Sequence, residues 1–163
     1  MITQDELKLL FRYVEGKLFR IKTVRNNAKA NSHAGWTTTR GYRKIQICGK
    51  HYAEHRLVWL WFKGSFPENE IDHINHIKDD NRIENLRDVT HATNGKNQSS
   101  QPTNTSGVQG VSWYKNNKRW IAFITVDGNS IHLGSYLEFH EAVNARKNAE
   151  VLYGFHENHG NSI

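Results

Sequence analysis

The chain has 163 residues, enough for one ordinary domain or two very small ones. Its 22 Lys and Arg residues outnumber its 16 Asp and Glu residues, and a pI near 9.5 favours a polyanionic partner such as nucleic acid over an acidic substrate. Hydrophobic residues make up 37% of the sequence, which excludes a disordered basic tail and indicates a folded core.

The cysteine content and the hydropathy pattern limit the class of protein further. Cys48 is the single cysteine, so an intramolecular disulfide is impossible and paired CxxC zinc knuckles are absent. No apolar run approaches the ~20 residues that cross a bilayer, and residues 1–6 are polar rather than signal-like. We therefore expect a soluble, cytoplasmic protein with no membrane partner.

Local patterns in the first half predict a helix, short strands and a second helix. Residues 3–6 have the form of a capping box that precedes an apolar pattern with helical spacing. Residues 11–47 then become strand-like, with turn signals at Glu15-Gly16 and Arg40-Gly41. Residues 54–63 form a broad apolar face before Gly64, which predicts the main core helix of this half.

A polar segment separates this half from a second predicted unit. Residues 98–106 contain Gln, Ser, Pro, Thr and Asn without a large apolar side chain, which is typical of a linker with a boundary near Pro102. Beyond it, three strands are predicted at residues 110–114, 119–126 and 130–136. Small and apolar residues then recur at helical spacing from Ala142 to Leu152, which predicts a helix lying close on that sheet.

Residues 71–98, IDHINHIKDDNRIENLRDVTHATNGKNQ, concentrate Asp, His and Asn more than any other part of the chain. The pattern predicts a strand ending near His73, a turn at 78–81, a returning strand at 83–89 and a helix that starts near Thr90. The expected unit is therefore a ββα hairpin plus helix.

In a ββα unit the end of the first strand lies beside the helix, so Asp72 and Asn94 could offer oxygen ligands to one hard cation. Residues 1–70 hold 13 basic and 6 acidic side chains, whereas residues 71–100 hold 4 basic and 5 acidic ones. This distribution suits a cation-binding pocket flanked by a surface that attracts phosphate.

The sequence IDHINH…DDNRIENLRDVTHATNGKNQ resembles the HNH (ββα-metal) nuclease family, in the branch found in phage and intron homing endonucleases, over about residues 53–98. The resemblance implies that His73 is the general base that activates water and that Asn85 orients it. It also implies that Asn94 and Asp72 are the metal ligands. Two protein ligands completed by water and phosphate oxygens favour Mg²⁺, with Mn²⁺ as an alternative, over zinc.

The sequence leaves the roles of several neighbouring residues open. Arg56, Arg82 and Arg87 are candidate phosphate contacts, although a solvated face is an equally good interpretation of any single arginine. Whether the metal site includes further side chains is also open, and the candidates are His76, His91, Asn97 and Gln98.

Residues 107–153 resemble the ethylene-response-factor (Apetala-type) DNA-binding domain through GVSWYKNNKRW, HLGSY and EAVNARKNAE. The resemblance implies a three-stranded antiparallel sheet that is packed on one helix and enters the major groove. The candidate DNA contacts, by position, are Trp113, Lys115, Lys118, Arg119 and Trp120, with Thr125 and His132 as weaker candidates. For Trp120 a core position is an equally good interpretation.

Together these patterns predict an α+β protein in two parts. Residues 1–98 would form an N-terminal strand segment and an HNH nuclease domain, 99–106 a linker, and 107–163 a DNA-binding domain. We expect a phage-type homing endonuclease that cuts double-stranded DNA as a monomer or homodimer; its target and the number of strands cut stay open. The alternatives are a catalytically silent DNA-binding regulator and a nuclease without a preferred site.

Overall fold

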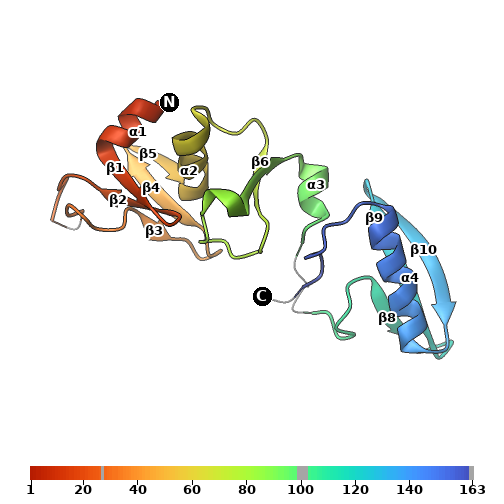
Figure 1. Ribbon diagram of the computed structural model, residues 1–163. Helices are drawn as coiled ribbons and strands as arrows, with labels where there is room; N and C mark the ends of the chain where they lie inside the picture. The colour runs from red at the N-terminus through yellow and green to blue at the C-terminus, as the bar shows by residue number, and fades with distance from the viewer. Residues whose placement is uncertain (27, 99–102, 162–163) are drawn as a thin grey trace. The chain divides into compact units, whose positions relative to one another are not determined.

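The structure is a computed structural model that describes residues 1–26, 28–98 and 103–161 (Figure 1). Contacts divide the chain into two compact units, Met1–Thr90 and His91–Ile163. Each unit combines short helices with small antiparallel sheets, which confirms the predicted α+β class. None of the helices in the described ranges is long and apolar enough to cross a membrane.

The first unit follows the predicted order of elements. It contains α1 (Gln4–Leu10), β1 (Phe11–Val14), β2 (Lys17–Arg20), β3 (Trp36–Thr37), β4 (Arg43–Ile47), β5 (Lys50–Ala53), α2 (Glu54–Lys63), β6 (Glu70–His73), the 3₁₀ turn η1 (Ile83–Asn85) and β7 (Leu86–Val89). The capping box forms as predicted, because Thr3 Oγ1 accepts from Glu6 N and Glu6 Oε2 accepts from Thr3 N. Gly64, at φ +80°, ends α2 in the left-handed conformation that suits glycine.

The core of this unit lies around α2, which packs on β2, β4 and β5. Leu57, Val58 and Leu60 of α2 are buried together with Leu18 of β2 and Ile45 of β4. The helix is therefore held by its apolar face, and its first turn directly follows the end of β5.

Antiparallel strands β6 and β7 form the predicted hairpin, with one difference in the returning arm. The strand expected at residues 83–89 begins only at Leu86, because Ile83–Asn85 form a 3₁₀ turn in which Asn85 N donates to Arg82 O at 2.9 Å. A 3₁₀ turn directs successive side chains around an axis, whereas a strand alternates them between two faces. Asn85 consequently points back into the loop that precedes it.

The second unit contains α3 (His91–Gly95), β8 (Val111–Tyr114), β9 (Arg119–Val126), β10 (Asn129–Tyr136) and α4 (Phe139–Leu152). The three strands form one antiparallel sheet in the order β10-β9-β8, and α4 packs against it, as predicted. Ala122 and Ile124 of β9 and Ala142 of α4 are fully buried between the two layers. The small residue at position 142 lets the helix approach the strands closely.

The division of the chain places residues 91–98 in the second unit, and the linker predicted at 99–106 stays a prediction. Residues 99–102, including Pro102, lie outside the described residues, but residues 91–98 group with the second unit. The reason is a set of contacts with the C-terminal segment: the N–H groups of His156 and Gly160 donate to the carbonyls of Lys96 and Gln98, at 3.0 and 2.8 Å. A composition pattern does not report such long-range pairing.

Leu57→Ala tests the importance of the α2 core. Leu57 is fully buried, so truncation leaves a cavity that should lower the free energy of unfolding by about 2–5 kcal/mol. Urea unfolding followed by circular dichroism measures the change. Leu9→Ala is the matched control, since Leu9 is 73% exposed and its loss should change stability by less than about 0.5 kcal/mol.

Candidate active site

Asp72 and His73 are the last two residues of β6, and both are buried. Asp72 lies opposite Arg87 of β7, and Arg87 Nε and Nη2 approach Asp72 Oδ2 at 2.8 and 2.7 Å. A guanidinium at this distance favours the ionised form of a carboxyl group. Arg87, predicted as a DNA contact, therefore serves as the charge partner of the predicted metal ligand.

The imidazole of His73 lies in a small aromatic and imidazole cluster. The His55 ring is centred 5.2 Å from the His73 ring at an interplanar angle of 86°, and the Tyr42 ring is centred 6.0 Å away. Burial lowers the pKa of His73, against the opposing effects of its hydrogen bond to Asn81 and the nearby Asp72 charge. Burial also lowers the pKa of His55, to about 3. Both rings are accordingly neutral near pH 7.

A buried polar network extends from His73 to the start of α2. His73 Nε2 lies 2.9 Å from Asn81 Oδ1, and Asn81 Nδ2 donates to Glu54 Oε2 at 3.2 Å. Asn81 is 1% exposed, and Glu54, the first residue of α2, is 0% exposed. The helix and the loop that follows β6 are thus joined through side chains alone.

Three groups from the N-terminal strand segment surround the Glu54 carboxylate. Leu18 N donates to Glu54 Oε1 at 3.0 Å, and His33 Nε2 lies 2.8 Å from the same oxygen. Arg43 Nε lies 3.2 Å from Glu54 Oε2, as an ion pair too oblique to be a hydrogen bond. A buried carboxylate needs such partners because its desolvation costs several kcal/mol.

Asn85 contacts groups of the loop that follows β6. Its Oδ1 accepts from Asn75 N at 3.0 Å, and its Nδ2 donates to Asn75 Oδ1 and to Asp80 O at 2.9 and 2.8 Å. That Asn85 orients His73 stays a prediction: the amide that lies against His73 Nε2 is that of Asn81, and Asn85 holds the loop through Asn75 and Asp80. The 3₁₀ turn at 83–85 is the reason, since it directs the Asn85 side chain into that loop.

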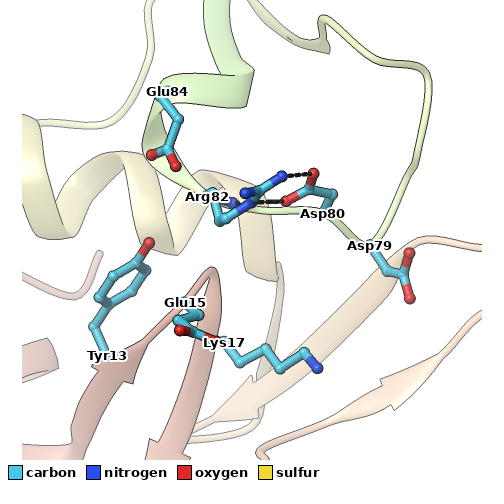
Figure 2. Close-up of a pocket in the computed structure, with 7 residues that line it drawn as sticks. All are labelled: Tyr13, Glu15, Lys17, Asp79, Asp80, Arg82 and Glu84. Atoms are coloured by element: carbon cyan, nitrogen blue, oxygen red, sulfur yellow. Dashed lines mark hydrogen bonds and ion pairs between the residues drawn. The ribbon is translucent and has the colours of Figure 1, made fainter.

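The two other predicted arginines of this unit have intramolecular partners. Arg56 donates to the carbonyls of Asn69 and Pro67, both at 3.0 Å, and so fastens the chain between α2 and β6. Arg82 lines an open pocket and pairs with Asp80, as Figure 2 shows, at 2.8 Å from Nε and 2.7 Å from Nη2. Half of the Arg82 side chain is still exposed to solvent.

In the second unit, Asn94 lies on α3. Lys115, Lys118 and Arg119 are exposed at the β8–β9 turn. Trp120 pairs with Trp113 across the strands and packs on Phe139 of α4 at a ring distance of 4.6 Å. For Trp120 this favours the core interpretation, while Trp113 remains 44% exposed.

Thr125 and His132 are both exposed. Strand alternation places them on the face opposite Ala122 and Ile124, together with Arg119. The sheet thus has one face covered by α4 and one face that is open within its unit.

The donor atoms of the first unit fit a hard cation better than zinc. The described residues contain no group of three His, Cys, Asp or Glu side chains arranged to hold a metal ion. Asp72 supplies a carboxylate paired with Arg87, and Cys48 is an exposed thiol on the β4–β5 turn. A site built on a single carboxylate would need amide, water and phosphate oxygens to complete it, which is the ligand chemistry of Mg²⁺.

Residues 52–96 match the family described as HNH endonuclease. This segment is an HNH endonuclease domain. It contains the predicted residues Asp72, His73, Asn85 and Asn94 and also His55, Glu54 and Asn81, which sequence reasoning missed. A glutamate at the start of a helix and an asparagine in a turn have ordinary local roles, so only the contact between them identifies the network. The other partners of Glu54, namely Leu18, His33 and Arg43, precede the HNH segment.

Two phage proteins are similar to the chain over part of its length. It is 33% identical over 75 residues to Protein 3.8 of Escherichia phage T7, which covers 45% of this chain and 62% of that protein. It is 38% identical over 94 residues to DNA endonuclease I-HmuI of Bacillus phage SP01, which covers 54% of this chain and 53% of that protein. The chain thus spans about half to three fifths of these relatives. No solved structure matches it.

Asp80→Asn tests the ion pair that closes the loop after His73. The hydrogen bond from Arg82 is the main cause that lowers the pKa of Asp80 to about 2, so the pair stabilises the fold fully above the unfolded-state pKa of about 3.9. This contribution is lost as the pH falls through about 2. Because Arg82 is half exposed, we expect a loss of only about 1 kcal/mol at pH 7.

Urea unfolding of the wild type and of Asp80→Asn between pH 7 and pH 2 measures this difference, which should vanish at the acidic end. Asp79→Asn is the control, because Asp79 lines the same pocket (Figure 2) but is exposed. A difference that is independent of pH, or equal for the two variants, would contradict the role given to the pair.

Proposed function

We propose that this protein is a metal-dependent DNA endonuclease of the ββα-metal type that hydrolyses a phosphodiester bond with His73 as general base. The observation that supports it most directly is the buried imidazole of His73, bonded through Nε2 and adjacent to the Arg87–Asp72 pair, inside the segment that matches the HNH endonuclease family. The similarity to a relative named as a DNA endonuclease agrees with this proposal.

His73 would take a proton from a water molecule that attacks the phosphorus. A neutral imidazole is required for this step, and burial of His73 lowers its pKa in the direction that keeps it neutral. Loop contacts of Asn85 would keep the imidazole and its surroundings in place while DNA binds. As the water oxygen bonds to phosphorus, the bond to the leaving 3′ oxygen breaks.

Asp72 and Asn94 would hold the divalent cation, with Mg²⁺ preferred over Mn²⁺ because of the oxygen donor set. When bound, the cation supplies positive charge that stabilises the phosphate and the leaving oxygen in the transition state. Arg87 would hold the Asp72 side chain in place through their ion pair. Water and phosphate oxygens would complete the coordination.

Residues 107–153 would form an Apetala-type reader of double-stranded DNA. Its sheet has one face packed on α4 and an open face with Arg119, Thr125 and His132, beside the exposed Lys115 and Lys118. A narrow antiparallel sheet of this kind fits the major groove. The resulting protein would act at a preferred DNA site, in the manner of a phage homing endonuclease in the cytoplasm of its host, as a monomer or homodimer.

The alternatives are a DNA-binding regulator in which the HNH domain is silent and a nuclease without a preferred site. Incubation of the purified protein with plasmid and Mg²⁺ distinguishes the regulator from a nuclease, because a regulator would bind without nicking or linearising the DNA. Mapping of cut ends on the neighbouring genomic DNA distinguishes a site-specific nuclease from one without a preferred site, because the latter would give scattered ends.

His73→Ala should lower the rate of plasmid cleavage at least about 100-fold, because general-base catalysis contributes about 10²–10⁴-fold. DNA affinity should stay nearly unchanged, since the base is needed for proton removal and not for groove contacts. Single-turnover cleavage with Mg²⁺, with EDTA as the metal-free control, measures the rate, and a gel-shift titration measures binding. His140→Ala is the matched control, because His140 is an exposed histidine on α4. Cleavage at the wild-type rate by His73→Ala would remove His73 from the mechanism.

Combined replacement of Lys115, Lys118 and Arg119 by Ala tests the DNA reader. If these side chains contact phosphates, affinity should fall and the slope of log K against log salt should become shallower by up to about 3. The cleavage rate at saturating DNA should be unchanged. Salt titrations of binding measure the slope, with Lys147→Ala on α4 as a control for loss of a surface charge. An unchanged slope would refute phosphate contact by this turn.

A further inference from the structure

We infer that Glu54 and Asn81 are positioning residues that set the tautomer of His73, so that Nε2 carries the proton and Nδ1 carries the lone pair used as the base. This inference deepens the proposed nuclease function and rests on it. It assigns a role in the reaction to two residues that a substrate would not touch, because both are at most 1% exposed.

The Glu54 carboxylate can only accept hydrogen bonds. Its surroundings are donors: Leu18 N–H at 3.0 Å, His33 Nε2 at 2.8 Å and the Arg43 guanidinium at 3.2 Å. These neighbours suit a group that only accepts hydrogen bonds. The remaining neighbour of Glu54 Oε2, the Asn81 amide, must therefore present its NH₂ group and not its oxygen.

This orientation of the Asn81 amide fixes what faces His73. With Nδ2 bonded to Glu54 at 3.2 Å, the carbonyl oxygen Oδ1 is the atom that lies 2.9 Å from His73 Nε2. An amide oxygen accepts and cannot donate, so His73 Nε2 must be the protonated nitrogen. In a neutral imidazole the lone pair then resides on Nδ1.

The opposite tautomer of His73 would be unfavourable at both contacts of Asn81, the one with His73 and the one with Glu54. A lone pair on His73 Nε2 would face the lone pairs of Asn81 Oδ1, and rotation of the amide to relieve this would bring Oδ1 against the Glu54 carboxylate. Both arrangements leave buried polar groups without hydrogen bonds. A free imidazole interconverts its tautomers readily, whereas the tautomer of His73 is fixed by the Glu54 carboxylate, which acts through the Asn81 amide.

Asn85 does not compete for this role, because its side-chain amide bonds Asn75 and Asp80. Asn85 therefore holds the loop, and Asn81 selects the nitrogen of His73 that carries the proton. A general base with its proton on the wrong nitrogen can keep its geometry and still lose most of its activity.

Long-range ¹H–¹⁵N spectra of the full chain with ¹⁵N-labelled histidine test the inference directly. The His73 signals are assigned by their absence from the spectrum of His73→Gln. In the wild type we expect a protonated, pyrrole-type signal for Nε2 and an unprotonated, pyridine-type signal for Nδ1. The reverse pattern would overturn the inference whatever the behaviour of any variant.

Glu54→Gln and Asn81→Leu test whether the tautomer of His73 matters for cleavage. Glu54→Gln keeps the shape of the side chain but lets its amide present either end to Asn81, and Asn81→Leu removes the acceptor. We expect His73 to show a mixture of tautomers in both variants and the single-turnover cleavage rate to fall about 10–100-fold, the effect typical of residues that orient another ligand or base. DNA affinity should stay within about 2-fold of wild type, an outcome that a disrupted fold would not give.

Glu150→Gln is the matched control, since Glu150 is also a buried carboxylate paired with an arginine, Arg146, but lies in the second unit. It should leave both the tautomer and the rate unchanged. Wild-type cleavage by Glu54→Gln and Asn81→Leu, with or without a change of tautomer, would overturn the inference and leave the nuclease proposal intact. A wild-type protein that does not cut plasmid in the presence of Mg²⁺ would instead overturn the nuclease proposal itself.

Discussion

The first unit is organised around one buried carboxylate, that of Glu54. A charge that is 0% exposed costs several kcal/mol to desolvate unless donors surround it, and here they come from β2, from the segment before β3 and from β4. The N-terminal strand segment is therefore required by the helix that follows it. Loss of any donor would leave the carboxylate partly uncompensated in the core.

The same carboxylate connects folding to the candidate chemistry. One side of it accepts from the backbone of Leu18 and from His33, while the other reaches the Asn81 amide that contacts His73. Because the network reaches rigid groups at the start of α2, the packed core fixes the position of the His73 imidazole. The HNH segment alone lacks Leu18, His33 and Arg43, so the residues before it complete the environment of its histidine.

Sequence reasoning succeeded where local physics decides and failed where distant groups meet. The capping box of α1, the glycine stop of α2 and the three strands before α4 each follow from patterns within one element. The Glu54–Asn81 contact and the pairing of Lys96 and Gln98 with the C-terminal segment depend on partners far along the chain. The Asn81–His73 contact and the 3₁₀ turn at Ile83–Asn85 depend on how the loop after β6 folds back. For the same reason Asp72 and His73 were identifiable as candidates, but Glu54 was not.

The Arg87–Asp72 pair resolves an apparent conflict in the proposed chemistry. A nuclease must bring a phosphate close to a carboxylate, and two anions in a partly buried site repel each other. The guanidinium at 2.7 Å offsets the Asp72 charge, so the pair is close to neutral before a cation arrives. A cation held by Asp72 would supply further positive charge here, which would favour the approach of the phosphate. On this view the arginine that sequence reasoning assigned to DNA acts on DNA through Asp72.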